Sequence, residues 1–133
     1  MTQATPYLHF NGDCREAMTF YRDCLGGELV MQTVGESPMA QGMPAEAHDR
    51  ILHATLQHGA AELMASDMMD GGEVATGNVL TICINGGTRD ETRRYFDALA
   101  VGGTVGHALV DEFFGMFGDL TDRYGISWMF QAN

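Results

Sequence analysis

The pattern of apolar and polar positions predicts two helices, and the first begins near residue 14. Asp13, with Glu16 three residues later, has the spacing of a capping box, and Gly26-Gly27 supplies a stop. Between them, apolar side chains recur at i, i+3, i+4, i+7 and i+8, as on one helix face: Ala17, Phe20, Tyr21, Cys24 and Leu25.

The second helix repeats the same signals. Thr88 and Glu91 have capping-box spacing, and Gly102-Gly103 ends the helix. Its apolar stripe has the same spacing: Thr92, Tyr95, Phe96, Leu99 and Ala100.

Strand-forming segments surround each helix, and together they make a repeat. The segments are 6–10, 28–34, 51–58 and 62–65 in the first half, and 79–84, from about 104, 113–120 and 126–131 in the second. Thr88 corresponds to Asp13, about 75 residues earlier, so each half is a βαβββ unit. One such unit cannot cover both faces of its sheet, so we expect the two to pair.

We therefore predict an α+β fold in one domain, residues 1–133, with a generic α+β sandwich as the alternative. Module one is 5–67, the linker 68–77 and module two 78–133. Segment 35–50 has no clear period and contains two Pro and two Gly. A loop of this length is either a functional lid or simply mobile, and its Met39 and Met43 would suit a soft cover over an apolar pocket.

Charge excludes several function classes. The 133 residues carry a net charge of −11, with seven basic residues that are all Arg. Such a surface disfavours nucleic acid as a partner, and without Lys there is no Schiff base and no P-loop. No apolar run is long enough to span a membrane and no leader is visible. We expect a cytoplasmic protein.

Three cysteines, Cys14, Cys24 and Cys83, give an odd number, which argues against a disulfide framework. Cys14 and Cys24 lie on one predicted helix, about 15 Å apart, too far to bridge. No pair has zinc-finger spacing. We expect reduced, mostly buried thiols; a catalytic Cys would need a base that the fold supplies.

Three segments in this order resemble the PhnB-like branch of the vicinal oxygen chelate superfamily (glyoxalase, bleomycin resistance protein, dihydroxybiphenyl dioxygenase). They are PYLHFNGDCREAMTFYRDCLGGEL (6–29), ILHATLQHGAAELMASD (51–67) and FFGMFGDLTDRYGISWMFQ (113–131). The resemblance implies two βαβββ modules, from one chain or exchanged between subunits, that form a cupped mixed sheet, and a homodimer. Enzymes of that superfamily hold a divalent metal in the cup on His, Gln or Glu, where it polarises substrate oxygens. Relatives without metal bind and sequester drugs.

The ligand positions implied by this resemblance do not carry metal ligands. They fall on Thr5 or Pro6, Met64, Val79 and Met129. Hard divalent ions prefer oxygen or imidazole donors. We therefore expect no metal and no other cofactor.

Strand alternation selects the candidate site. Within 51–58 it places Ile51, His53, Thr55 and Gln57 on the presumed cup face, with Leu52, Ala54, Leu56 and His58 opposite. The first strand contributes Tyr7 and His9, with Leu8 and Phe10 in the core, and module two contributes Val79, Thr81 and Cys83. The expected ligand-binding set is Tyr7, His9, His53, Thr55, Thr81, Cys83 and Met129.

His53 is the candidate catalytic residue, as a general base or acid or as a hydrogen-bond partner of the ligand. The alternative is a strand histidine satisfied by a neighbour or by a dimer partner. Glu62 and Glu112 are possible assistants, although strand-end carboxylates are usually just solvated.

Five other residues have structural interpretations. Asp67 is expected to make a turn by bonding its own backbone. Trp128 is expected in the core or a dimer interface rather than on a ligand. Asp122 and Arg123 are expected to form the turn before the last strand, with Gly125 at the bend.

The leading functional hypothesis is metal-free binding of a small molecule by sequestration. The second is a lyase-, isomerase- or dioxygenase-like enzyme that uses His53 or a relocated metal. The third is a regulatory protein whose cup is filled by its own side chains. Proteins of this branch are linked by name to ubiquinone methylation and phosphonates. The chain has no Rossmann-type glycine fingerprint and no basic cluster, although Arg50 or Arg123 alone could bind a phosphonate.

Overall fold

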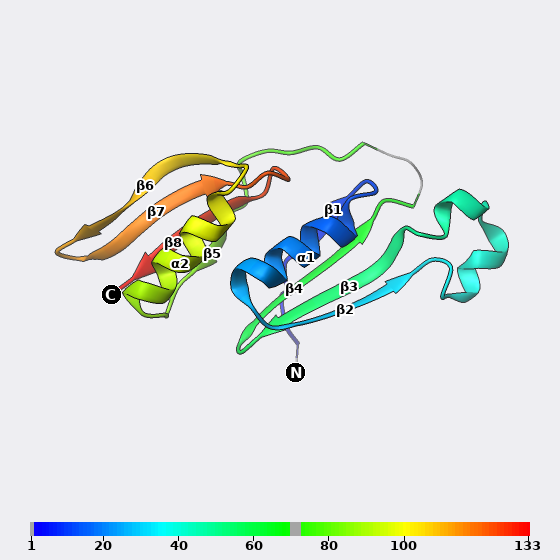
Figure 1. Cartoon of the computed structure of the whole chain (residues 1–133), viewed down its shortest axis with the longest axis horizontal. Helices are drawn as coiled ribbons and strands as arrows, with labels where there is room; N and C mark the ends of the chain where they lie inside the picture. The colour runs from blue at the N-terminus through cyan, green and yellow to red at the C-terminus, as the bar shows by residue number, and fades with distance from the viewer. Residues whose placement is uncertain (1, 70–72) are drawn as a thin grey trace. The chain divides into compact units, whose positions relative to one another are not determined.

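Each half of the chain forms a four-stranded sheet with a helix on one face (Figure 1). The computed structural model describes residues 2–69 and 73–133, so residues 70–72 of the predicted linker lie outside the described residues. The chain divides into two compact units, Met1–Val74 and Ala75–Asn133, each defined by contacts among its own residues. The α+β class and the two βαβββ modules are confirmed.

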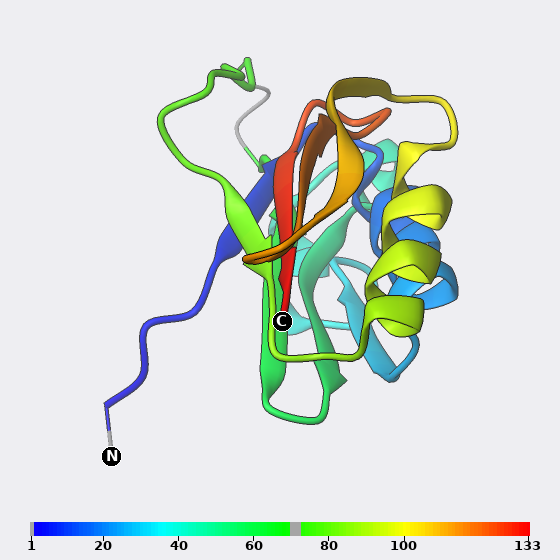
Figure 2. The same cartoon turned by 90° about the vertical axis from the view of Figure 1, so that its left-hand side faces the viewer.

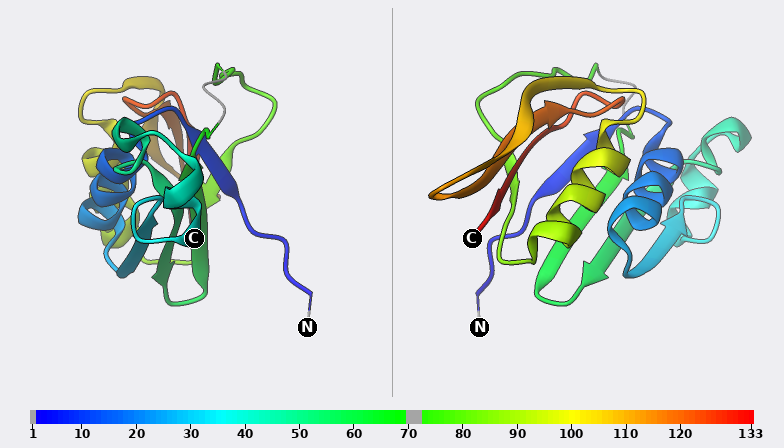
Figure 3. Two further views of the ribbon diagram at one scale, coloured as in Figure 1. Left: turned by 90° about the vertical axis from the view of Figure 1, so that its right-hand side faces the viewer. Right: turned by 60° about the vertical axis from the view of Figure 1, so that its left-hand side comes forward.

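The first unit contains β1 (Tyr7–Phe10), α1 (Cys14–Leu25), β2 (Glu28–Thr33), β3 (Ile51–His58) and β4 (Ala61–Asp67). The sheet order is β1-β4-β3-β2, with β1 parallel to β4 and the other pairs antiparallel. Helix α1 packs on β2, β3 and β4 (Figures 1 and 3).

The second unit repeats this order with β5 (Ile82–Ile84), α2 (Arg89–Ala100), β6 (Thr104–Glu112), β7 (Gly115–Thr121) and β8 (Ser127–Ala132). Its sheet order is β5-β8-β7-β6, with β5 parallel to β8. Helix α2 packs on β6, β7 and β8 (Figure 2). Neither helix is both long and apolar enough to cross a membrane, within the part of the chain that the structure describes.

Each helix packs against one face of its own sheet and buries part of its predicted stripe. The stripe residues that are only half-buried are Phe20, Cys24, Leu25, Tyr95 and Ala100. In the first unit Ala17, Met18 and Tyr21 are fully buried, as is Ala54 of β3. In the second, the ring of Phe96 meets that of Phe130 edge-on, with centroids 5.1 Å apart. Trp128 is fully buried, which confirms that it belongs to the core. Each helix therefore covers one face of the sheet in its own unit.

The two helices begin differently. The capping box of Thr88 and Glu91 is confirmed, with both reciprocal hydrogen bonds present. The box predicted at Asp13 and Glu16 is wrong, because the Asp13 side chain makes no capping hydrogen bond.

Asp67 supplies the missing acceptor for α1. One carboxylate oxygen accepts from the backbone N–H groups of Gly12 (2.7 Å) and Cys14 (3.1 Å), and the other accepts from that of Ile51 (2.9 Å). The carboxylate is buried. The prediction that Asp67 bonds the backbone of its own turn is therefore wrong, because the end of β4 lies beside the start of α1.

Two predicted strands are too long at their starts. Val79 and Leu80 precede β5 and are almost fully exposed. The strand β5 pairs only with β8, and the residues that would face Val79 and Leu80 lie in the turn before Ser127, where β8 begins. Phe113 and Phe114 form the β6–β7 turn instead of opening a strand. Gly115 follows with φ +130°, and a Cβ there would collide with the carbonyl oxygen of Ala132, so the glycine decides the turn against two strand-forming residues.

The predicted irregular segment 35–50 contains two short 3₁₀ helices, η1 (Pro38–Gly42) and η2 (Ala45–Ala47), at one end of the first sheet (Figure 1). Ser37 caps η1. His48 Nε2 lies 3.0 Å from the carbonyl oxygen of Ala40 and 3.2 Å from that of Met43. These contacts tie the segment to itself, and its role as a lid stays a prediction.

Candidate functional site

The helix-free face of the first sheet, here called the open face, gathers most of the predicted site. Tyr7 pairs with Met64, and Met64 pairs with Thr55, so these three side chains share that face. His9 pairs with Ser66, and because Ala54 pairs with Ala65, His53 is level with Ser66 as well, so the two histidines lie on the same side of this row. The predicted facing of Tyr7, His9, His53 and Thr55 is consistent with the register of all four strands.

Ile51 departs from this facing. The register shifts between Gln32 and Thr33, so that Gln32 pairs with His53 while Thr33 pairs with Ile51. Leu52 is the extra residue, and it resets the alternation. Ile51 is consequently fully buried, and its predicted place on the open face is wrong.

His53 lies between two hydroxyl groups. Its Nδ1 is 3.2 Å from Tyr7 Oη, and its Nε2 is 3.1 Å from Thr55 Oγ1. An imidazole can donate through one nitrogen while it accepts through the other. The three side chains thus form a hydroxyl–imidazole–hydroxyl chain whose hydrogen bonds can run in either direction.

Tyr7 is the part of this chain that meets solvent most directly, with 40% of its surface exposed. Its ring lies 5.3 Å from that of His9 and 5.8 Å from that of His53, tilted by 36° and 34°. Such offset, tilted contacts between rings are favourable. Because both nitrogens of His53 already face hydroxyls, a ligand on this face meets Tyr7 first and His53 through it.

The predicted assistants lie elsewhere on the strands. Glu62 is on the open face of β4, where it accepts a hydrogen bond from Gln57 Nε2 over 3.1 Å. Glu112 ends β6 in the second unit, where it pairs with Gly115 beside the hairpin turn.

The open face of the second sheet holds only part of its predicted set. Cys83 pairs with Met129, which pairs with Asp119, so these side chains share one face. Thr81 precedes β5 and lies outside the strand. Cys83 is exposed, so the prediction of mostly buried thiols is wrong for it.

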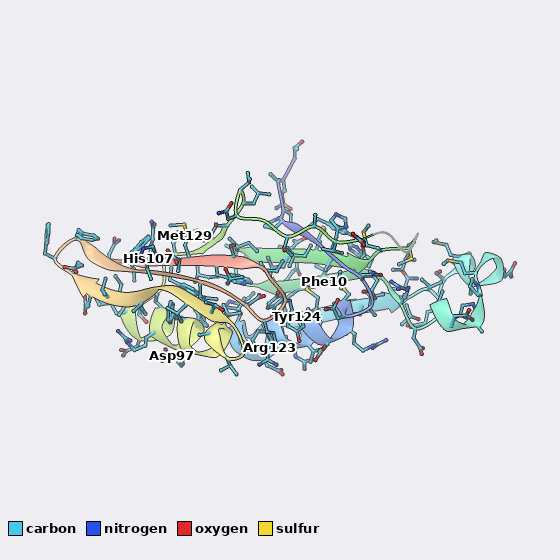
Figure 4. All side chains as sticks on the ribbon, turned by 90° about the horizontal axis from the view of Figure 1, so that it is seen from above. Phe10, Asp97, His107, Arg123, Tyr124 and Met129 are labelled. Atoms are coloured by element: carbon cyan, nitrogen blue, oxygen red, sulfur yellow. The ribbon has the colours of Figure 1, made fainter. Side chains whose placement is uncertain are left out.

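Sequence reasoning missed a histidine–aspartate pair on β6 and β7. His107 Nδ1 lies 2.8 Å from Asp119 Oδ2, and the backbone N–H of His107 donates to Asp119 Oδ1 over 3.0 Å. His107 and Met129 are labelled on this sheet in Figure 4. The only available signal was Gly106, where a Cβ would collide with Asp119 Oδ1. Register shifts on both sides of His107 aim its side chain.

The metal positions implied by the resemblance can now be placed. Met64 and Met129 lie on the two open faces, whereas Val79 is outside any strand. Thioethers are poor ligands for hard divalent ions. Within residues 2–69 and 73–133, no three His, Cys, Asp or Glu side chains are grouped closely enough to hold a metal ion. The residues at these positions therefore do not fit the metal of the superfamily's enzymes.

Two groups outside the site have shifted pKa values. Burial, reinforced by the charge of Asp67, raises the pKa of the Cys14 thiol from 9.0 to about 12. Hydrogen bonds from the side chain and backbone of Thr33 lower the pKa of Glu36. A neutral, fully buried thiol is unreactive, so Cys14 is structural.

The two arginines considered as phosphonate ligands both donate hydrogen bonds to oxygen atoms of the protein. Arg50 donates to the carbonyl oxygen of Met68 and to Asn11 Oδ1. Arg123 donates to the carbonyl oxygen of Val101 and lies in the turn between β7 and β8, labelled with Tyr124 in Figure 4.

That turn is formed as predicted. Buried Asp122 accepts from the backbone N–H groups of Tyr124 and Ile126 and from Trp128 Nε1. Gly125 bends with φ +87°. Asp122 therefore fixes the start of β8 and is a structural residue.

Comparison with known proteins settles the family. Residues 2–131 match the family described as 3-demethylubiquinone-9 3-methyltransferase. The protein belongs to this family. The resemblance to the PhnB-like branch is thereby confirmed. The fold is shared with a glyoxalase/bleomycin resistance protein/dioxygenase family enzyme from Burkholderia phytofirmans PsJN, which is 14% identical with a TM-score of 0.62 over 97% of this chain and 98% of its own.

Relatives in this family match along nearly their whole length. Protein YjdN of Escherichia coli (strain K12) is 32% identical over 135 residues, covering 94% of this chain and 91% of YjdN. The crystal structure of protein PA1353 from Pseudomonas aeruginosa is 40% identical with a TM-score of 0.87, covering 100% of this chain and 98% of PA1353. The Bacillus cereus PhnB protein, described as a putative 3-demethylubiquinone-9 3-methyltransferase, is 24% identical with a TM-score of 0.79, covering 99% of this chain and 100% of its own.

Proposed function

We propose that this protein binds a small molecule on the open face of its first sheet without a metal. The observation that carries the proposal is the hydrogen-bonded chain of Tyr7, His53 and Thr55. It presents the Tyr7 hydroxyl, which can donate or accept a hydrogen bond, among aromatic rings. Ligand sites typically combine a mainly apolar or aromatic surface with a few oriented polar groups. The methionine at position 64, between Tyr7 and Thr55, adds a soft contact rather than a metal ligand.

Methyl transfer, the activity in the family's description, has no support among these residues. The two strand-to-helix connections, 11–13 and 85–88, are too short for a dinucleotide-type glycine fingerprint. The open face also offers no fixed cation for a phosphonate. Binding is the activity that the residues on this face supply by themselves.

The test is a thermal-shift screen of metal-free protein against aromatic antibiotics, phosphonates, thiol adducts and divalent metals. A ligand that binds the folded state raises the Tm with the logarithm of its concentration over Kd. For a hit, Tyr7→Phe should weaken binding about three- to ten-fold, the value of one neutral hydrogen bond. Tyr95→Phe on α2 is the matched control and should leave Kd unchanged.

Two results would overturn the proposal. One is a stoichiometric divalent ion in protein purified without a His tag. The other is a hit whose affinity is the same in Tyr7→Phe and in the unaltered protein.

A second candidate is an enzyme in which His53 works through Tyr7, and the hydroxyl–imidazole–hydroxyl chain favours it. Tyr7 would take a proton from the ligand while its own proton passes to His53 Nδ1, and the resulting imidazolium would donate a hydrogen bond from Nε2 to Thr55 Oγ1. His53→Gln should then abolish turnover and keep ligand binding within about three-fold. Loss of binding and turnover together would assign His53 to binding alone.

A further inference from the structure

The open face of the first sheet carries acidic groups at one end. Glu28 pairs with Gln57, and Gln57 pairs with Glu62, so two carboxylates flank an amide across β2, β3 and β4. Glu62 lies two residues before Met64, which pairs with Tyr7. At the rise of a strand, Glu62 therefore lies about 7 Å along β4 from the level of Tyr7.

The cations of the first unit lie off this face. All seven basic residues are Arg, and none is on a strand: they are Arg15, Arg22, Arg50, Arg89, Arg93, Arg94 and Arg123. Arg50 alone is held at the far end of the first sheet, by Met68 and Asn11. These contacts are four residues beyond Met64 and Tyr7, or about 13 Å along the strands.

We propose that the ligand of this face is an aromatic molecule without negative charge, and that a protonated amine one short spacer from the ring is preferred. This inference rests on the proposed function, because it concerns the same face. The rings of Tyr7, His9 and His53 accept an aromatic partner. An amine about 7 Å away reaches Glu62, whereas an anion at that distance meets a like charge and lies out of reach of Arg50.

The expected preference is modest because the carboxylates are accessible. Glu28 is exposed and Glu62 is partly exposed. Ion pairs at such positions change affinity by a factor of about two to five, and salt screens them. The whole-chain charge of −11 adds to the discrimination against anions at low salt.

The experiment compares four probes with the same ring and similar spacers: phenethylamine, 2-phenylethanol, 3-phenylpropionate and 2-phenylethylphosphonate. Kd values are measured by NMR titration of the full chain at pH 8, in low salt and again in about 0.5 M salt, where screening is nearly complete. Glu62→Gln is the test variant, and Glu46→Gln on η2 is the matched control. Tyr7→Phe locates each probe on the open face.

We expect the amine to bind about two- to five-fold tighter than the alcohol in low salt, and both to bind tighter than the two anions. Glu62→Gln or high salt should remove the amine's advantage, and Glu46→Gln should retain it. Equal affinities for all four probes, with each sensitive to Tyr7→Phe, would overturn this inference and leave the proposed function standing.

Tightest binding of the phosphonate, lost in Arg50→Gln, would also overturn the inference and move the site to the other end of the sheet. Absence of Tyr7-dependent binding for every probe would contradict both the inference and the aromatic character of the proposed site.

Discussion

Removal of the Asp67 carboxylate should destabilise the first unit more than any surface change. In Asp67→Ala, the backbone N–H groups of Gly12, Cys14 and Ile51 lose their acceptor at 2.7–3.1 Å. A buried donor left unsatisfied costs about 1–3 kcal/mol. The three donors share one acceptor and Gly12 is open to water, so we expect a loss of about 4 kcal/mol rather than the full sum.

Asp67→Asn removes the charge and one hydrogen-bond acceptor of the side chain while its size stays nearly the same. The amide oxygen can still accept from Gly12 and Cys14, but the amide nitrogen then faces the N–H of Ile51, which places two donors together. We expect this variant to lose about 2 kcal/mol. Asp23→Asn, on the exposed side of α1, is the matched control and should change stability by less than about 0.5 kcal/mol.

Urea unfolding followed by far-UV circular dichroism measures these free energies. Trp128 is the only tryptophan and lies in the second unit, so its fluorescence reports that unit separately. A shift in dichroism without a shift in fluorescence shows that the units unfold independently. A loss below about 0.5 kcal/mol in Asp67→Ala would refute the role assigned to the carboxylate.

Four further predictions concern thiols, the second core and assembly. Ellman's reagent should modify Cys83 first, and Cys14 only on unfolding; rapid labelling of Cys14 would contradict its burial. Because the pKa of Cys14 rises from 9.0 in the unfolded chain to about 12 in the fold, its stabilisation is complete below pH 9 and is lost as pH rises toward 12. By pH 10 the loss should reach about 1.4 kcal/mol in urea titrations, and Cys14→Ala should lack it. Trp128→Phe removes a 2.8 Å hydrogen bond to Asp122 and should cost about 2–3 kcal/mol by dichroism, whereas a cost near zero would contradict that bond's contribution. The homodimer stays a prediction: light scattering should give twice the 14.5 kDa chain mass, and the monomer mass would exclude it.

Periodicity was sufficient for the architecture of each unit. The stripes around Tyr21 and Phe96 lie in α1 and α2, and alternation placed His53 and Thr55 together. These features depend on neighbours within a few residues along the chain. The capping box of Thr88 and Glu91, whose contacts are equally local, was also predicted correctly.

The errors fall where a distant partner decides. Asp67 acts on residues 53 and 55 positions earlier in the sequence, so neither its own role nor that of Asp13 was visible locally. The start of β5 depends on where β8 begins. The pair of His107 and Asp119 forms only when β6 and β7 are aligned with register shifts on both sides of His107, and the periodicity of the sequence does not predict these shifts.

The different starts of the two helices affect the order in which the chain can fold during synthesis. Helix α2 has its capping partners three residues apart, so its first turn is complete once that short segment has formed. The first turn of α1 relies on Asp67, at the end of the last strand of its unit. The ribosome must therefore release all of β4, and the intervening loop must close, before α1 is fixed at its N-terminus. The half of the protein made first is consequently secured by the last strand of that half to be translated.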